Sequence, residues 1–294
     1  MQVLALFGPT AVGKTGVALA VAERLRARGE DPIAVSCDAI QVYRDLGIIS
    51  GAPTAAERER LEHRLVGIVA IDGEFSAGLF AGLAHAEIDA RLAEGRRPIV
   101  VGGTGLYLRA ALSDLDLRPP VPAEVRAGVE RELAERGPAA LHAELDPDLA
   151  ETVHPNDRKR IARLLELQRA GIYPHASAVG MWTARLRRPA LLVGLTVDRE
   201  ELRRRIDARV EAMLAAGAEE KVRRAAERGA SRTARAAIGF EQLLRGDVEA
   251  TKSAQRAYAR RQLTWMRRMD AVHTIDRAER SDDEIAAEIV PMLD

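Results

Sequence analysis

Residues 2–15 read QVLALFGPTAVGKT, and this stretch decides the fold. The run 2–7 is apolar and ends at a glycine and a proline, which is typical of a buried parallel strand. The next eight residues fit the phosphate-binding pattern G-x-x-x-x-G-K-[ST], and a helix is expected from about Lys14 to Arg28. A phosphate-binding loop between a strand and a helix therefore indicates an α/β fold.

Strands and helices continue to alternate after this loop. The sequence predicts strands over 32–37, 98–103 and 191–197, a helix over 76–94, and a last short strand at 271–275. Alternation at this spacing favours a parallel sheet like that of P-loop nucleotide-hydrolysing proteins.

A linker with three prolines in four positions, 119–122, interrupts this rhythm. The residues after it are mostly helical in pattern until the strand at 191–197. We therefore expect a catalytic core made of 1–112 and 190–294, and a helical insertion domain over 113–189.

Composition excludes several classes of protein. The chain has 294 residues, of which 47% are apolar and 30% charged, so neither a disordered nor a fibrous protein is indicated. Cys37 is the single cysteine, which excludes an intramolecular disulfide and a multi-cysteine zinc cluster. No apolar run approaches the ~20 residues of a membrane span, and the start does not resemble a signal peptide, so a cytoplasmic location is expected.

The phosphate loop predicts a site for a diphosphate. Its amides would point at phosphate oxygens, Lys14 would add a charge, and Thr15 could hold magnesium. Asp38 follows the second strand at the same edge of the sheet, where it could be a magnesium ligand, a general base or a helix N-cap. Thr104 lies in a glycine-rich turn, 102–105, and offers a hydroxyl to the same pocket or simply closes a tight turn.

Basic side chains indicate where anions could bind. Arg209 lies within the apolar stripe of a predicted helix, so it needs either an anion or a structural ion pair. The helix expected over 157–170 has three basic residues in its first turn, where the helix dipole disfavours cations by ~0.3–1 kcal/mol each. An RNA backbone would offset that cost. A second basic face, on 256–267, is either a further RNA contact or ordinary solvated surface.

Seven blocks of sequence now make a resemblance specific. They are GPTAVGKT (8–15), DAIQVYRDL (38–46), the segment 98–112, HPNDRKRIARLLE (154–166), RIDARVEAML (205–214), AIGFEQL (237–243) and RRQLTWMRR (260–268). In content and order, nearly end to end, the chain resembles the bacterial tRNA dimethylallyltransferases.

The resemblance implies a reaction and its partners. Such enzymes transfer a dimethylallyl group from its diphosphate to the N6 amine of adenosine 37, 3′ of the anticodon, in tRNAs reading codons that begin with U. It implies Mg²⁺ at Thr15, Asp38 as the general base, Thr104 as a hydrogen-bonding partner, and Lys14 and Arg209 on the leaving diphosphate. The partner is the anticodon stem-loop, no membrane is involved, and a monomer is expected.

The resemblance also implies two sets of binding residues. The donor diphosphate is expected on Gly8, Pro9, Thr10, Ala11, Val12, Gly13, Lys14 and Thr15. The tRNA contacts are expected at Asp38, Ala39, Ile40, Gln41, Thr104, Arg126, Lys159, Arg160, Ile161, Ala162, Arg163, Ala236, Ala237, Ile238, Gly239, Phe240 and Glu241.

The sequence departs from the family pattern at several positions. Ala39 replaces the usual serine, Glu62 and His63 replace paired histidines, the loop 47–54 lacks a lysine, and 236–240 lacks the usual glutamine and tyrosine. Three alternatives stay open on sequence grounds: a prenyltransferase acting on free adenylate, a P-loop kinase that uses ATP, and a tRNA-binding protein without catalysis.

Overall fold

The computed structural model describes residues 1–172 and 185–294. The chain divides into two compact units, one formed by Met1–Leu115 with Gly180–Asp294 and the other by Asp116–Val179. The second unit lies within the insertion predicted at 113–189. Part of the predicted insertion, 173–184, lies outside the described residues.

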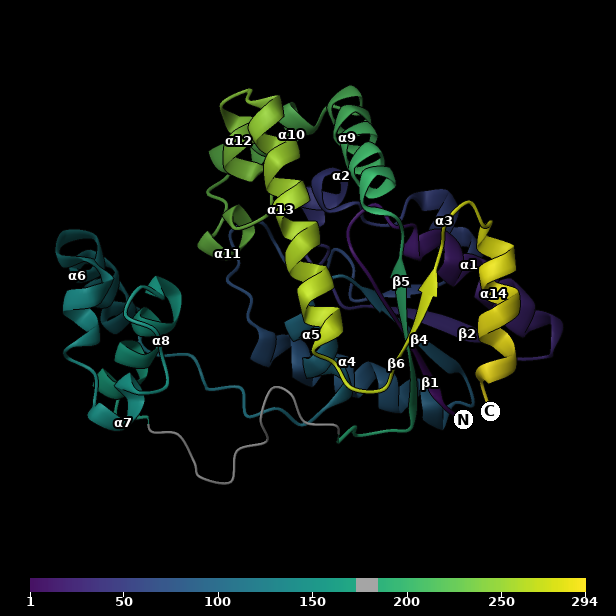
Figure 1. Ribbon diagram of the computed structural model, residues 1–294, viewed down its shortest axis with the longest axis horizontal. Helices are drawn as coiled ribbons and strands as arrows, with labels where there is room; N and C mark the ends of the chain where they lie inside the picture. Colours follow the sequence, from purple (N-terminus) through teal and green to yellow (C-terminus); the bar gives the residue numbers. More distant parts are fainter. Residues whose placement is uncertain (173–184) are drawn as a thin grey trace. The chain divides into compact units, whose positions relative to one another are not determined.

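The larger unit is built on a six-stranded sheet whose neighbouring strands all run parallel (Figure 1). The strand order is β3-β2-β4-β1-β5-β6. The strands are β1 (Val3–Phe7), β2 (Pro32–Ser36), β3 (His63–Arg64), β4 (Arg97–Gly102), β5 (Ala190–Thr196) and β6 (Val272–Asp276). The five predicted strands are confirmed to within one residue at each end, whereas the two-residue β3 has no apolar run that would reveal it.

Helices surround the sheet and include the predicted ones. They are α1 (Lys14–Ala27), α2 (Gly47–Ser50), α3 (Ala55–Arg60), α4 (Ala77–Ala93), α5 (Gly105–Leu112), α9 (Arg199–Ala215), α10 (Ala218–Glu227), α11 (Arg232–Arg235), α12 (Phe240–Leu244), α13 (Val248–Arg267) and α14 (Asp282–Ile289), with 3₁₀ turns η1 (Arg44–Leu46) and η2 (Val290–Met292). Among the described residues, no helix is long and apolar enough to cross a membrane.

The core of this unit lies on both faces of the sheet. Leu4 and Leu6 of β1 point to the same face and pack with α1 and α14 in one buried cluster. The intervening residues of β1 are also buried, because a parallel sheet is covered on both sides. On the other face α4 and α5 pack together, with the rings of Phe80 and Tyr107 4.5 Å apart between centroids.

The second unit contains α6 (Ala123–His142), α7 (Pro147–Ala150) and α8 (Arg158–Arg169). Its own apolar core includes Val129, Leu141 and Ile161, all fully buried. A kink divides α6 at Gly137, which precedes a proline and has a left-handed φ of 78°. Asp157 caps α8 by accepting a hydrogen bond from the backbone nitrogen of Arg160.

Candidate active site

Three loops meet at the carboxyl edge of the sheet. They follow β1, β2 and β4, which are neighbours in the order β2-β4-β1. The phosphate loop, Asp38 and Thr104 therefore line one cavity of about 970 Å³, at the edge where parallel α/β folds bind ligands. The prediction that the two glycine-rich turns enclose one pocket is confirmed.

The phosphate loop is shaped by backbone conformations that few residues adopt. Gly13 has a φ of 95° immediately before α1, and Ala11 has a φ of 64°. Arg277 supports the loop from outside the cavity: its Nη1 donates to the carbonyl oxygen of Gly13 at 3.2 Å, and its Nη2 pairs with Asp282 at 2.6 Å. The side chain of Val12 is buried in the core, so it contributes to the loop through its backbone.

The ammonium of Lys14 lies inside the loop. Its Nζ donates to the carbonyl oxygens of Gly8 at 3.0 Å and Pro9 at 2.8 Å. Burial, followed by the positive charge of Arg209, lowers the pKa of Lys14 to about 8, and the carboxylate of Asp38 opposes that shift. Binding an anion would relieve both unfavourable effects.

Arg209 reaches the same cavity from α9. Its Nη2 donates to the carbonyl oxygen of Ser50 at 3.3 Å, while its Nε is buried and has no hydrogen-bond partner in the described part of the chain. Within 1–172 and 185–294, no carboxylate forms an ion pair with it, so the alternative of a structural ion pair is not found. Burial lowers its pKa and Asp38 partly restores it. A half-buried guanidinium that pairs with no carboxylate of the described residues suits a bound anion.

Asp38 uses one carboxylate oxygen to hold its loop. Oδ1 accepts hydrogen bonds from the backbone nitrogens of Ile40 at 2.9 Å and Gln41 at 3.3 Å. No helix begins at Asp38, so the N-cap alternative is wrong and the side chain closes a turn instead. No described residue donates to Oδ2, which leaves this oxygen to accept a proton.

The hydroxyl of Thr104 also faces the cavity. Thr104 precedes α5 but makes no side-chain capping bond. Its Oγ1 lies 3.4 Å from the backbone nitrogen of Ala39 and 3.2 Å from the hydroxyl of Tyr258. The sequence does not reveal this contact of Tyr258, because helical periodicity shows only which residues face inwards.

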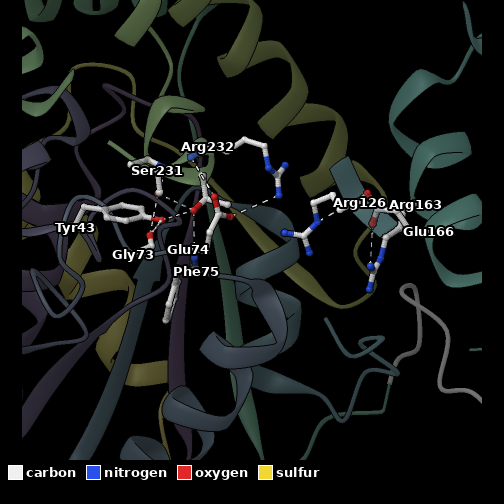
Figure 2. Close-up of polar contacts among 11 residues, drawn as sticks. Tyr43, Gly73, Glu74, Phe75, Arg126, Arg163, Glu166, Ser231 and Arg232 are labelled. Carbon is white, nitrogen blue, oxygen red and sulfur yellow. Dashed lines mark hydrogen bonds and ion pairs between the residues drawn. The ribbon is translucent and has the colours of Figure 1, made fainter. Parts of the chain in front are cut away.

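Thr233 and residues 236–238 form a wall of the cavity that local sequence does not reveal. Figure 2 shows how this wall is fixed: the hydroxyls of Tyr43 and Ser231 both donate to the carbonyl oxygen of Gly73, at 3.2 and 2.8 Å. Thr233 accepts from the backbone nitrogen of Phe75 at 3.1 Å. This network holds Ala236, Ala237 and Ile238 at the cavity, whereas Phe240 does not line it and is fully buried.

The remaining predicted RNA contacts of the larger unit lie in two segments, 39–41 and 239–241. Ala39, Ile40 and Gln41 line the cavity. The side chain of Glu241 pairs with Arg235, and Gly239 adopts a φ of 95° that lets α12 begin. These positions stay predictions as RNA contacts.

In the smaller unit, Glu166 holds two of the predicted RNA-binding arginines. This carboxylate is 7% exposed and pairs with Arg163 at 3.1 Å and Arg126 at 4.0 Å (Figure 2). Lys159 and Arg160 are exposed, Ala162 is half-buried, and the side chain of Ile161 is fully buried in the core of the unit. The basic first turn of α8 therefore presents its charged side chains to solvent.

The oxygen ligands that the protein supplies at the cavity fit magnesium only when a bound substrate adds further oxygens. Among the described residues, no group of three or more His, Cys, Asp or Glu side chains could hold a metal ion. Thr15 and Asp38 line the cavity with one hydroxyl and one carboxylate. Because magnesium prefers six oxygens and is often bound with substrate phosphates, these residues fit it if a diphosphate supplies further oxygens.

The comparison with protein families settles the relationship of this chain. Residues 41–269 match the family described as IPP transferase. The chain belongs to this family. A tRNA dimethylallyltransferase of Anaeromyxobacter sp. is 40% identical over 96% of this chain and 97% of its own length. A tRNA dimethylallyltransferase of Kineococcus radiotolerans is 38% identical over 100% of this chain and 96% of its own length.

Solved structures of the IPP transferase family share this fold. The tRNA isopentenylpyrophosphate transferase of Bacillus halodurans has a TM-score of 0.71 and 30% identity, covering 99% of this chain and 95% of that one. A eukaryotic dimethylallyltransferase acting on tRNA has a TM-score of 0.75 at 24% identity, over 95% of this chain and 74% of that one, and supports the fold alone.

Proposed function

We propose that this member of the IPP transferase family transfers a dimethylallyl group from dimethylallyl diphosphate to N6 of adenosine 37 in tRNAs reading codons that begin with U. One observation carries the proposal. Lys14 and Arg209, two cationic side chains that pair with no carboxylate among the described residues, face the same cavity as Asp38 and Thr104. The cations suit a departing diphosphate, and the carboxylate suits proton removal.

The phosphate loop would stabilise the leaving group. An allylic diphosphate ionises when the bond between C1 and its oxygen breaks, and negative charge then develops on the diphosphate. Fixed amides, Lys14 and Arg209 stabilise that charge without reorganising, which is the largest contribution in many enzymes. The core is therefore a P-loop fold of the nucleotide-hydrolase type whose phosphate loop would stabilise a diphosphate as it leaves.

Asp38 would then complete the transfer. The amine nitrogen forms a bond to C1 while a proton moves from the nitrogen to Oδ2 of Asp38. Oδ1 stays bound to the amides of Ile40 and Gln41, so the carboxylate keeps its orientation. Thr104 would place a hydrogen bond next to the base. The adenine must leave its stack to reach this cavity, which requires an RNA-gripping surface such as the basic turn of α8 in a helical insertion, 113–189.

Magnesium would be held by the hydroxyl of Thr15 together with diphosphate oxygens. Bound there, it would neutralise part of the donor's charge. We further propose that the tRNA contact is the anticodon stem-loop, and that the protein acts as a monomer in the cytoplasm.

One experiment separates this function from its rivals. The protein is incubated with labelled dimethylallyl diphosphate and either unmodified tRNA or AMP, and the labelled tRNA is digested to locate the label. Label at adenosine 37 is the expected result. Label in AMP alone would establish a free-nucleotide prenyltransferase, and phosphoryl transfer from ATP without prenyl transfer would establish a kinase.

A further inference from the structure

Helix α13 carries a row of polar side chains that face the cavity. Gln255, Tyr258 and Gln262 are spaced by three and four residues, so they lie on one face of the helix. Each reaches a different loop. Gln255 donates to the carbonyl oxygen of Ile238 at 3.1 Å, and Tyr258 contacts Thr104 at 3.2 Å.

Gln262 joins two loops with one amide group. Its Oε1 accepts a hydrogen bond from the backbone nitrogen of Thr10 at 2.8 Å, and its Nε2 donates to the carbonyl oxygen of Gly103 at 2.8 Å. The residue is 3% exposed. A Cβ atom at Gly103 would overlap Nε2, so glycine at this position makes the close approach possible.

These two hydrogen bonds connect the loop on the side of the prenyl donor to the turn on the side of the adenine that accepts the prenyl group. Thr10 belongs to the phosphate loop, and Gly103 precedes Thr104 directly. A carboxamide is planar and carries a donor and an acceptor on neighbouring atoms, so it fixes the separation of the two backbone groups that it bridges. An apolar side chain of the same length would fill the space without fixing that separation.

The amide of Thr10 has a second consequence. In a phosphate-binding loop the backbone N–H groups are the ligands of the anion. Here the N–H of Thr10 is committed to Gln262 and is withdrawn from that task. The bond therefore contributes little to gripping the diphosphate, and its main effect is to place the loop.

We propose that Gln262 is a positioning residue that holds the phosphate loop and the Gly103–Thr104 turn at the separation required for transfer. The proposal rests on the proposed function, because it assigns the donor to one loop and the acceptor to the other. The loss of this bridge should slow the chemical step more than it weakens binding of either substrate, since misplacement of bound reactants by about 1 Å can cost about 100-fold in rate.

The first test uses Gln262→Met, which keeps the length of the side chain and removes both hydrogen bonds. The single-turnover rate constant of prenyl transfer is expected to fall about 100-fold. The dissociation constants of dimethylallyl diphosphate, measured without tRNA, and of tRNA should each stay within about threefold of wild type. Retention of the wild-type rate would overturn the proposal. A loss of rate accompanied by an equal weakening of the binding of both substrates would also overturn it.

A second variant gives a readout that a purely structural role would not change. In Gln262→Glu the ionised carboxylate can accept from Thr10 but cannot donate to Gly103, whereas the protonated carboxyl can do both. The single-turnover rate of this variant, divided by that of wild type, is therefore expected to rise as the pH falls from 8 to 6. A ratio that is flat or falls over that interval contradicts the proposal, even if Gln262→Met does not fold.

Gln168 provides a matched control in the smaller unit. It makes the same pair of bonds, accepting from the backbone nitrogen of Asp146 at 2.8 Å and donating to the carbonyl oxygen of Glu144 at 3.0 Å. Gln168→Met removes an equivalent bridge far from the phosphate loop in sequence and should leave the rate constant unchanged. Absence of prenyl transfer by the wild-type protein would instead reject the proposed function.

Discussion

The guanidinium of Arg209 occupies the space that a side chain at Gly51 would need. A Cβ atom at residue 51 would overlap Nη2, and Gly51 has a left-handed φ of 60°. The neighbouring Ser50 supplies the carbonyl oxygen that accepts from Nη2. The short helix α2 therefore sets the position of an arginine that follows it by 159 residues.

Gly51→Ala tests this relationship. The added methyl group should displace Arg209 and force a left-handed conformation that costs about 1 kcal/mol. We expect the dissociation constant for dimethylallyl diphosphate to rise about tenfold, because one charge-assisted contact is weakened. Gly47→Ala is the control, since a Cβ there would meet Ala52 at an ordinary 3.8 Å. Equal effects of the two variants in a calorimetric titration would argue against the relationship.

Lys14 predicts how donor binding depends on pH. Its pKa is lowered to about 8 and a bound diphosphate would raise it again, so the free protein loses its charge before the complex does. Affinity for dimethylallyl diphosphate should be constant below pH 8 and fall by up to tenfold per pH unit above it. Titrations between pH 6.5 and 9.5 measure this. Lys14→Met should bind more weakly without that decline, and a flat wild-type profile would disprove the assignment.

Asp38→Asn separates proton transfer from loop structure. Asparagine can still accept from the backbone nitrogens of Ile40 and Gln41, so the turn should persist while the base is lost. The single-turnover rate is expected to fall about 10²–10⁴-fold. Because the carboxylate raises the pKa of Lys14, the decline in donor affinity should begin at lower pH in the variant.

Asp45→Asn serves as the control for that experiment. Asp45 pairs with Arg228 at 2.9 Å and does not line the cavity. The single-turnover rate of Asp45→Asn should equal that of the wild type. A wild-type rate in Asp38→Asn would return the chain to the class of tRNA-binding proteins without catalysis.

Arg126 and Arg131 lie on the same helix, α6, and differ in their surroundings. Arg126 is held beside the buried Glu166, whereas Arg131 is exposed. Arg126→Ala should weaken tRNA binding and reduce the slope of log K against log salt by about 1. Arg131→Ala should change both quantities less, as filter binding at several salt concentrations would show. Equal losses would mean that only net charge matters.

Arg97 links the start of β4 to both ends of the described chain. It is 2% exposed and contacts Glu30 at 2.5 Å and the carbonyl oxygens of Gln2 at 2.7 Å and Asp294 at 2.6 Å. Arg97→Ala should lower the free energy of unfolding by about 3 kcal/mol, because it leaves a partly buried carboxylate and two carbonyls unpaired.

An exposed pair of the same kind provides the comparison for Arg97. Arg24 and Asp283 form two hydrogen bonds of 2.7 Å at the surface. When the free energy of unfolding of each variant is measured by urea titration, Arg24→Ala should lower it much less than Arg97→Ala, since surface ion pairs contribute little. If both substitutions cost the same, burial is not what makes Arg97 important.

Local patterns in the sequence determined five of the six strands, the phosphate loop and the candidate base. A phosphate loop depends on glycines at fixed spacing and on the strand and helix beside it, all within residues 2–28. Asp38 was found for a similar reason, because it follows a strand directly. Such features depend on neighbours in the chain, and a single sequence displays them.

Only the tertiary structure decided which groups surround these elements and in what state. Gln262 bridges Thr10 across 252 residues, and Arg209 meets Ser50 across 159. Whether Arg209 had a carboxylate partner, and whether Thr104 only closed a tight turn or offered its hydroxyl to the cavity, depended on packing between distant elements. Periodicity places a residue on the inward face of its helix, but the loop that it meets there is set by how the whole chain folds.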